Sequence, residues 1–331
     1  MKASVYVVSD GDLRRKGNTL GFKHTSGRFI YVPIETVKDV FVFGETTITK
    51  KLIAFLAKKG VPVHFFTDRD LYLGTFYPVE SILSGKTTLK QAEHYLDYEK
   101  RLALARKFVI GATLNILVVL KYYLRQGKDV HNTINYIDRL FPRISSTASV
   151  EELLALEGNI RDAYYNSFDY IIQNPDFRFE YRSKHPPRNE LNALISFGNA
   201  LLYCAILTEI YFTHLDPRIG YLHSTNERKF TLNLDVAEIF KPILVDRVIF
   251  SLINKGMLKK NQFGKEGPGV YLNDEGRRVF LDEWDKRLKE VVLNPNSGEA
   301  STYRMILRKE LYKIEKHILD EAEYEPYVSK W

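Results

Sequence analysis

Residues 89–126, LKQAEHYLDYEKRLALARKFVIGATLNILVVLKYYLRQ, mark the point at which the character of the sequence changes. Apolar side chains recur here every three to four residues, which is the spacing of one face of an α-helix. Upstream of this stretch the apolar runs are short, and downstream the helical spacing continues. The stretch therefore predicts a chain whose first part is β-rich and whose second part is helical.

The first 80 residues contain short runs rich in Val, Ile, Phe and Tyr, which is the composition of β-strands. Gly, Asp and Asn separate these runs, which are 4–10, 18–24, 28–34, 37–44 and 61–68. One amphipathic helix interrupts them, with Thr46 and Thr47 as its expected caps and Gly60 at its end. No glycine-rich phosphate loop lies in this part, so we expect it to serve packing or dimerisation.

The predicted fold class is α+β: a small N-terminal β-sheet domain with one helix, followed by a larger all-α catalytic domain. The expected boundaries are residues 1–85 for the β domain and 86–331 for the helical domain. The length of 331 residues agrees with two domains, because single hydrophobic cores stop growing near ~250–300 residues.

Composition predicts a cytoplasmic protein that does not associate with membranes. The only cysteine, Cys204, cannot form an internal disulfide and lies in an apolar run, and the N-terminus lacks the apolar stretch of a signal peptide. The net charge of +7, with 21 Tyr and 20 Phe, is compatible with nucleic-acid binding but does not by itself indicate it.

An acidic residue interrupts the apolar face of a predicted helix. On a helix from Leu153 to Ile172, Glu157 falls within the apolar stripe, and Arg161 is one turn further on. A carboxylate on a face that packs into the core is costly unless it is paired, protonated or bound to a metal. A buried Glu157–Arg161 ion pair and a metal site are the two interpretations that this helix leaves open.

A second predicted helix, residues 232–240, carries two acids among apolar residues on most sides. Asp235 and Glu238 are three residues apart and therefore neighbours on one strip of the helix. A divalent cation would relieve their repulsion, whereas the alternative is an exposed edge of a partly buried helix. His223, twelve residues before Asp235, adds an imidazole. Carboxylates with one histidine suit Mn²⁺ or Mg²⁺, and no Cys/His spacing indicates structural zinc.

Basic residues lie close to these acids in the sequence. Acids that hold a metal, surrounded by cations, are the expected arrangement for phosphodiester chemistry, because Lys and Arg bind the phosphate backbone. The candidate DNA-binding residues are Arg161, Arg182, Lys184, Arg188, Arg228, Lys229 and Lys241.

Four segments in order carry a family resemblance: LEGNIRDAYY, PPRNELNALISFGNALLY, LDPRIGYLH and FTLNLDVAEIFKP. With the β-first, helix-second order, they resemble the CRISPR adaptation integrase family, metal-dependent DNA endonucleases that capture new spacers. The resemblance implies a homodimer formed through the β domain. It also implies a small ferredoxin-like CRISPR adaptation partner protein and action on double-stranded and branched DNA.

The resemblance also assigns roles to residues. It implies that Glu157, His223, Glu238 and Asp235 form the catalytic, metal-binding set, with Mn²⁺ or Mg²⁺ as the cofactor. Glu238 matches the third ligand and Asp235 the accompanying acid, although many relatives carry aspartate at the position of Glu238. The implied reaction is transesterification, in which the 3′-hydroxyl of a captured DNA end attacks a phosphodiester at the repeat boundary. With water as the nucleophile the same site is a nuclease.

Two other functions remain open from the residues. Residues 245–260 followed by 269–280 have the pattern of a winged helix, which would make the protein a non-catalytic DNA binder with structural acids. In that interpretation residues 264–270 form the wing, although they could equally form an ordinary hairpin beside the active site. The second alternative is a metal-dependent phosphoesterase that acts on small substrates.

Overall fold

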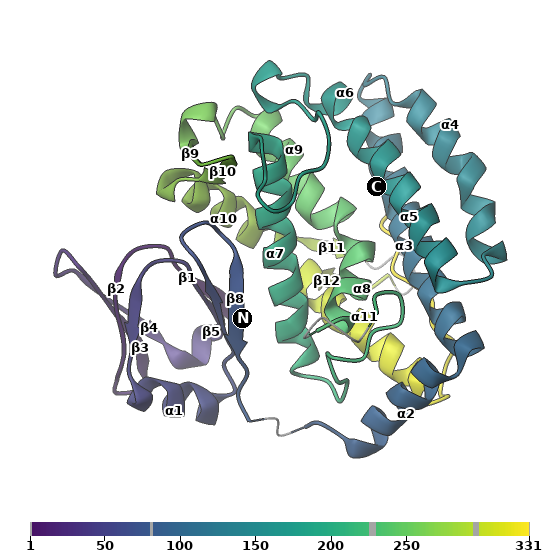
Figure 1. The fold of residues 1–331 in the computed structure, drawn as a ribbon. Coiled ribbons are helices and arrows are strands. Elements are labelled where there is room, and N and C mark those ends of the chain that lie inside the picture. Colours follow the sequence, from purple (N-terminus) through teal and green to yellow (C-terminus); the bar gives the residue numbers. More distant parts are fainter. Residues whose placement is uncertain (1, 80–81, 225–229, 294–297, 331) are drawn as a thin grey trace.

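The computed structural model describes residues 2–79, 82–224, 230–293 and 298–330, and within them the predicted α+β order is confirmed (Figure 1). The β-rich part lies at one side of the molecule and the helical part at the other. The chain passes between them from β8 (Tyr72–Phe76) to α2 (Gly85–Leu96).

The β-rich part contains two four-stranded sheets, ordered β1–β5–β7–β8 and β4–β3–β2–β6. In the first sheet β1, β5 and β7 run parallel and β8 is antiparallel to β7. In the second sheet β4, β3 and β2 are antiparallel neighbours, and β2 pairs in parallel with β6. The remaining strands are β1 Ala3–Val7, β2 Gly11–Lys16, β3 Thr19–His24, β4 Phe29–Pro33, β5 Val37–Val42, β6 Thr46–Ile48 and β7 Val63–Phe66.

Apolar side chains from both sheets and from α1 (Lys50–Lys59) form one core. The hydroxyl of Thr49 caps α1 by accepting a hydrogen bond from the backbone N–H of Leu52 at 3.3 Å, and Gly60 ends the helix with φ +62°. The prediction that Thr46 and Thr47 cap this helix is wrong, because both residues belong to β6 and pair with β2.

The helical part surrounds two long apolar helices, α3 (Tyr98–Arg125) and α7 (Glu190–Ile210). By length and composition alone either could cross a membrane, but 67% and 83% of their apolar windows are buried inside the structure, as in core helices. The other helices are α4 His131–Leu140, α5 Val150–Asn166, α6 Phe168–Ile172, α8 Leu232–Phe240, α9 Arg247–Asn254, α10 Asp274–Lys289 and α11 Tyr303–Ile318. Two short hairpins are β9 Phe263–Glu266 with β10 Gly269–Leu272 and β11 Val291–Leu293 with β12 Ala300–Thr302. The first covers residues 264–270, for which the sequence left a wing or a hairpin open, and the second was not predicted.

Helix α8 contacts both α3 and α7, and eight of its nine residues are buried. A π-helical turn, Pro242–Asp246, follows it. Pro242 has no N–H to donate to the carbonyl of Glu238, so the α-helical hydrogen bonding is interrupted there. The N–H of Asp246 bonds to the carbonyl of Lys241 at 3.0 Å, five residues earlier, which is the π-helical pattern. The acids that the sequence placed on α8 are therefore held inside the helical part and not on an exposed edge.

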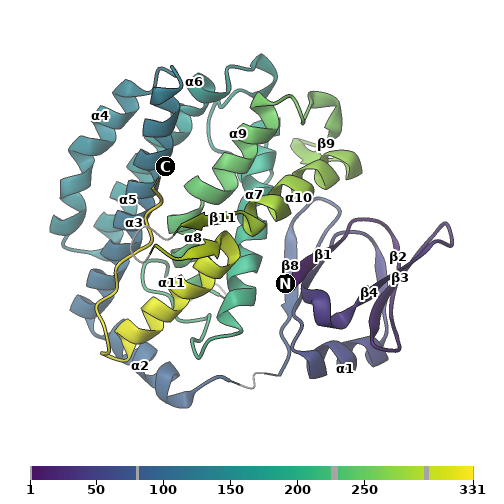
Figure 2. The same cartoon turned by 180° about the vertical axis from the view of Figure 1, so that it is seen from behind.

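The C-terminal segment lies along α3, as the view from behind shows (Figure 2). The buried amide of Asn115 on α3 donates to the carbonyl of Tyr327 and to the carbonyl of Ile239 in α8, both at 2.9 Å, and accepts from the N–H of Ser329 at 2.9 Å. One side chain thus fixes α8 and the C-terminal segment to the same helix.

Candidate active site

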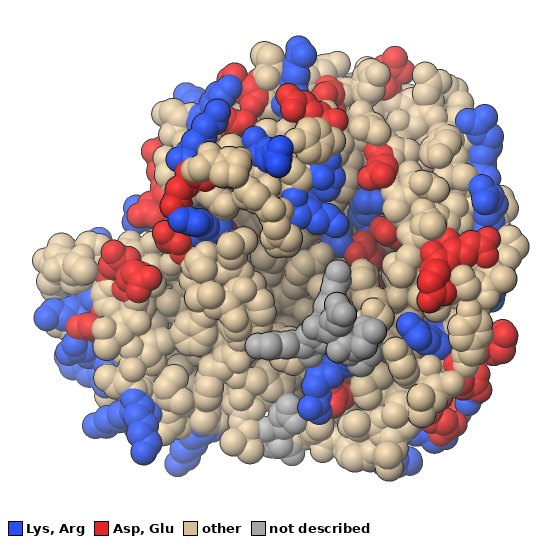
Figure 3. All heavy atoms as spheres, viewed as in Figure 1, with Lys and Arg blue, Asp and Glu red and all other residues tan. Residues whose placement is uncertain are grey.

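A cavity of about 770 Å³ opens in the helical part and is lined by residues from distant segments of the sequence. Figure 3 shows basic side chains around the hollowed middle of this face. The candidates Glu157, His223 and Glu238 all line the cavity. The structure therefore brings together three residues that lie far apart in the sequence.

Glu157 and Arg161 lie one turn apart on α5, which begins at Ser149, whose hydroxyl accepts from the N–H of Glu152 at 3.0 Å. Nε of Arg161 contacts Oε1 of Glu157 at 3.2 Å, so the ion pair considered from the sequence is present. Nη2 of Arg161 also contacts Oε2 of Glu238 at 2.5 Å. One guanidinium therefore bridges two acids from different helices.

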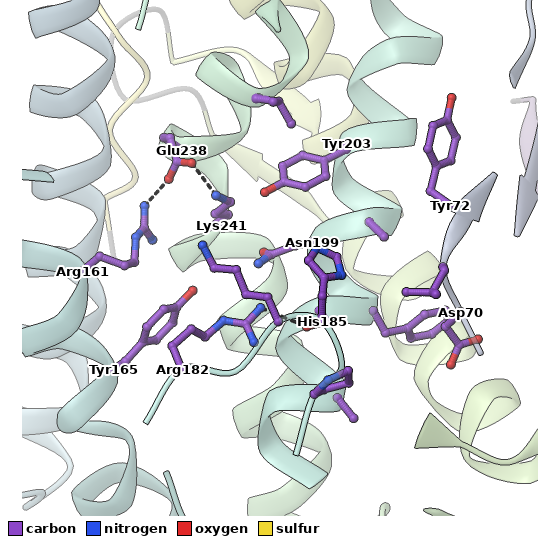
Figure 4. A pocket seen from close by; sticks show the side chains of 18 of the residues that line it. Asp70, Tyr72, Arg161, Tyr165, Arg182, His185, Asn199, Tyr203, Glu238 and Lys241 are labelled. Atoms are coloured by element: carbon purple, nitrogen blue, oxygen red, sulfur yellow. Dashed lines mark hydrogen bonds and ion pairs between the residues drawn. The ribbon is translucent and has the colours of Figure 1, made fainter. Parts of the chain in front are cut away.

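Glu238 has two cationic partners in a buried setting (Figure 4). Its second oxygen, Oε1, contacts Nζ of Lys241, one turn further along the chain. Burial raises the pKa of Glu238, but the charges of Lys241, Arg161 and His223 outweigh burial and lower it to about 2. Glu238 is therefore a carboxylate at neutral pH, as a metal ligand must be.

Asp235 has a different environment from Glu238, although it lies on the same helix. Its side chain is 0% exposed and does not line the cavity. Its carboxylate accepts hydrogen bonds from the backbone N–H groups of Tyr221 at 2.5 Å, Leu222 at 3.0 Å and His223 at 2.9 Å. Asp235 was predicted as a direct metal ligand, but both of its carboxylate oxygens accept hydrogen bonds from the loop before α8.

The imidazole of His223 is oriented by the same carboxylate. Nδ1 of His223 lies 2.8 Å from Oδ1 of Asp235, which leaves Nε2 as the nitrogen for other partners. Burial lowers the pKa of His223, but the hydrogen bond and charge of Asp235 outweigh it, so the pKa is raised overall. Asp235 therefore fixes both the loop and the ring orientation of His223.

The predicted basic residues divide between the cavity and other places. Arg161, Arg182, Lys184 and Lys241 line the cavity, whereas Arg188 is exposed and does not. Arg228 and Lys229 lie outside the described residues. The guanidinium of Arg182 donates to Asn192 Oδ1 and Ser196 Oγ of α7, both at 2.9 Å, and these two hydrogen bonds fix its position. Burial lowers the pKa of Lys184, and the charges of Arg182 and Lys241 lower it further.

Several cavity residues were not predicted from the sequence. Tyr165 on α5 was detectable, because it continues the four-residue spacing of Glu157 and Arg161. Asn199 and Tyr203 on α7 gave no signal among the apolar residues around them. Residues Arg69–Leu71 of the turn between β7 and β8, with Tyr72 at the start of β8, also line the cavity, so the β-rich part contributes to its wall. Nε of Arg277 in α10 holds this turn through Oδ1 of Asp70 at 2.7 Å.

The hairpin β9–β10 lies beside the cavity and not free in solvent as a wing would. Tyr271 of β10 lines the cavity, and the N–H of Val270 bonds the carbonyl of Pro187 at 2.8 Å. Nε of Arg69 reaches Glu266 at 2.7 Å. The sequence pattern of a helix followed by a wing therefore corresponds to α9 and a hairpin that is tied to the wall of the cavity.

The donor set fits a hard divalent cation, although its side chains are not yet arranged for one. Two carboxylates and an imidazole with a fixed ring are suitable ligands for Mn²⁺ or Mg²⁺. Among the described residues, however, no three His, Cys, Asp or Glu side chains already form a group that could hold a metal ion. Arg161 lies between Glu157 and Glu238 and occupies an oxygen of each.

Comparison with known proteins identifies the relatives of this chain. The family model for "CRISPR associated protein Cas1" matches residues 5–286. A "CRISPR-associated endonuclease Cas1 2" from Thermodesulfovibrio yellowstonii is 51% identical over 331 residues, covering 100% of both chains. A solved Cas1 protein from Thermotoga maritima has a TM-score of 0.88 at 40% identity, covering 99% of this chain and 100% of the other.

Two more distant structures share the fold. A casposase bound to integration product has a TM-score of 0.89 at 21% identity, covering 99% of this chain and 94% of the other. A Cas6-RT-Cas1–Cas2 complex has a TM-score of 0.86 at 18% identity, covering 100% of this chain and 36% of the other. At these identities the likeness concerns the fold alone.

Proposed function

Because the chain belongs to the CRISPR-associated Cas1 family, we propose that its cavity is the active site of a CRISPR adaptation endonuclease and integrase. It cleaves DNA and joins new spacers to the repeat array. The observation that carries this assignment to particular residues is the meeting of Glu157, His223 and Glu238 at one cavity lined by cations.

The three residues that would hold the metal are Glu157, His223 and Glu238, with Mn²⁺ or Mg²⁺ as the ion. A divalent ion bound there would activate an attacking oxygen and offset the charge that develops on the phosphate. Asp235 orients the imidazole of His223 and keeps its loop against α8. Its role is therefore to position a ligand.

The remaining cavity residues bind and orient the DNA. Arg182 and Lys184 present positive charge to the cavity, and Lys241 lies beside Glu238. These cations hold the phosphodiester while the 3′-hydroxyl of the incoming end attacks phosphorus. The attacking hydroxyl gives up its proton to solvent as a new P–O bond forms, the existing P–O bond at the repeat boundary breaks, and the released oxygen takes up a proton from solvent and leaves as a hydroxyl. Water in place of the 3′-hydroxyl gives cleavage of ordinary or branched DNA.

In this proposal the β-rich part forms the contact between two copies of the chain. Large apolar side chains are exposed on the edge strand β4, where Phe29, Ile30 and Tyr31 are 48%, 45% and 42% exposed. Unpaired edge strands with apolar side chains favour association. We therefore propose a homodimer through this part, which also joins double-stranded DNA and a small ferredoxin-like partner protein in the cytoplasm, without membrane contact.

The test is a supercoiled-plasmid assay with a synthetic DNA end, with and without Mn²⁺. Glu157→Gln and His223→Gln are expected to reduce both nicking and end joining by at least about a hundredfold, because each removes a metal ligand. Glu151→Gln makes the same change on an exposed position of α5 and should leave both activities unchanged.

Two outcomes would refute the proposal. Metal-dependent nicking that persists in Glu157→Gln would exclude this cavity as the active site. Hydrolysis of small phosphodiesters that duplex DNA does not inhibit would instead favour a phosphoesterase for small substrates.

A further inference from the structure

Arg161 occupies the place between two proposed metal ligands. Its Nε contacts Glu157 at 3.2 Å and its Nη2 contacts Glu238 at 2.5 Å, while Lys241 contacts the other oxygen of Glu238. The side chain of Arg161 is only 9% exposed. Both oxygens of Glu238 therefore already have a cationic partner at a nearly buried position.

This arrangement conflicts with the binding of a divalent ion in the same place. A divalent cation and a guanidinium that share buried carboxylates repel each other, and the repulsion is strong where solvent screening is weak. Arginine does not lose its charge in proteins, so it cannot relieve the conflict by releasing a proton. We therefore expect the guanidinium to move away from at least one of the two acids when the ion binds.

Asp246 provides a second partner for that guanidinium. It ends the π-helical turn after α8 and is 1% exposed. Burial raises the pKa of Asp246 to about 7, and the nearby charge of Arg161 lowers it only in part. Asp246 is thus close enough to Arg161 for their charges to interact, yet it lacks the close ion pair that would keep its pKa low.

Four polar atoms of Arg161, Tyr164 and Asp246 have hydrogen-bonding capacity to spare, although the hydroxyl of Tyr164 already lowers the pKa of Asp246. Within the described residues, both carboxyl oxygens of Asp246, Nη1 of Arg161 and the hydroxyl of Tyr164 are buried without a hydrogen bond of ordinary length. Tyr164 lies three residues after Arg161 on α5, and its hydroxyl lowers the pKa of the Asp246 carboxyl. Buried polar groups are costly when unpaired, so a shift of Arg161 toward Asp246 would pair a donor and acceptors at once.

From these contacts we infer that Arg161 is a mobile counter-ion of the metal site, with Asp246 as its alternative partner. When no ion is bound, Arg161 holds Glu157 and Glu238 near each other and offsets their repulsion. When a divalent ion binds, the guanidinium turns to Asp246, with the hydroxyl of Tyr164 beside it. This inference rests on the proposed metal site and adds two positioning residues, Arg161 and Asp246, that set its affinity for metal.

The two residues should have opposite effects on metal binding. Arg161→Met removes the competing charge and should tighten Mn²⁺ binding about tenfold or more, whereas Asp246→Asn removes the charged alternative partner and should weaken it about 10–100-fold. Asp246→Asn should have no effect in the Arg161→Met background, because the side chain that uses it is absent. In protein stripped of divalent ions, Arg161→Met should also lower the melting temperature, since the two acids lose their shared partner.

The experiment is a titration of EDTA-treated full-length protein with Mn²⁺ alone, followed by calorimetry and by the electron paramagnetic resonance signal of free Mn²⁺. Asp138→Asn, an equal charge change at an exposed position of α4, is the control and should leave the affinity unchanged. Should Arg161→Met not fold, Asp246→Asn alone decides the matter. An unchanged Mn²⁺ affinity in Asp246→Asn overturns the inference, as does weaker binding in Arg161→Met.

Failure of the inference and failure of the proposed function give different results. If Glu157→Gln and His223→Gln do not weaken Mn²⁺ binding, the metal site itself is wrongly assigned. If both weaken it while Asp246→Asn does not, the metal site stands and only the role of Asp246 is excluded.

Discussion

At the scale of single residues, the two acids of α8 have separate roles because they face different surroundings. Glu238 lines the cavity beside Arg161 and Lys241, whereas Asp235 points to the loop that carries His223. They are three positions apart on one helix, and this spacing alone made them appear to be one acidic strip. The partners on neighbouring segments therefore place Glu238 at the cavity, as a proposed ligand, and Asp235 against the loop that carries His223.

The first prediction concerns Asp235→Asn. An amide cannot accept all the N–H bonds that this carboxylate receives, so the loop and the ring of His223 lose their fixed orientation. We expect DNA nicking and Mn²⁺ affinity to fall about 10–100-fold, as for other partners of metal-bound histidine. Plasmid nicking and calorimetric titration measure the two effects.

A double variant tests whether Asp235 acts through His223. Adding Asp235→Asn to His223→Gln should reduce nicking little further, because the imidazole that Asp235 orients is already absent. Wild-type nicking in Asp235→Asn, or fully additive losses in the double variant, would contradict the positioning role.

At the scale of elements, the position of α8 is set by close packing against α7 and by the turn that follows. Gly198 of α7 faces this turn, since a Cβ at residue 198 would lie 2.5 Å from Cγ1 of Val245 and 3.0 Å from Cζ of Phe280. A side chain larger than hydrogen would therefore push α7 away from the segment that carries Glu238 and Lys241.

The second prediction compares two glycines inside helices. Gly198→Ala should lower the free energy of unfolding by about 1–3 kcal/mol, because the new methyl group overpacks the core. Gly158→Ala is the matched control: a Cβ there has no atom within 4 Å, and alanine should raise the stability by about 0.5–1 kcal/mol. Urea denaturation measures both, and equal effects of the two substitutions would contradict the packing argument.

At the scale of the whole molecule, a buried ionic network joins the β-rich part to the helical part. Arg304 of α11 contacts Asp39 of β5 at 3.1 Å and Glu209 of α7 at 3.7 Å, and Lys38 of β5 contacts Glu209 at 3.5 Å. Beside this network, His64 of β7 bonds Thr208 of α7 at 2.8 Å and is 0% exposed. The sheet that carries the β7–β8 turn therefore packs against the helical part through ion pairs and a buried histidine, whose protonation would change the stability of this interface.

The third prediction follows from His64. Burial lowers its pKa to about 4, because the loss of solvent and the charge of Arg304 outweigh the attraction of Asp39. The unfolded chain takes up a proton at this residue below about pH 6.5, whereas the folded protein does so only near pH 4. The stability that neutral His64 contributes is therefore complete above pH 6.5 and falls by up to about 3 kcal/mol as the pH drops to 4.

Urea denaturation of the wild type and His64→Gln across this pH range measures the effect. The stability difference between wild type and variant should shrink toward pH 4, whereas His131→Gln, at an exposed position of α4, should follow the wild type. Parallel curves for the wild type and His64→Gln would show that His64 is not held neutral in the folded protein.

The sequence by itself determined the order of a β-rich part before a helical part, because strand and helix spacing of apolar residues are local properties of the chain. It also determined the candidates Glu157, Asp235 and Glu238, since acids within apolar segments stand out without coordinates, and it added His223 as an imidazole twelve residues before Asp235. The match of four ordered segments to a known family gave these residues their expected roles.

Only the tertiary structure decided which of these side chains line one cavity and which are buried next to it without lining it. It separated Asp235 from Glu238, brought the β7–β8 turn to the cavity, and placed Arg161 between two acids on different helices. The physical reason is that burial, hydrogen bonding and charge pairing depend on neighbours in space. Residues 161, 238 and 246 become neighbours only when α5, α8 and the π-helical turn pack together.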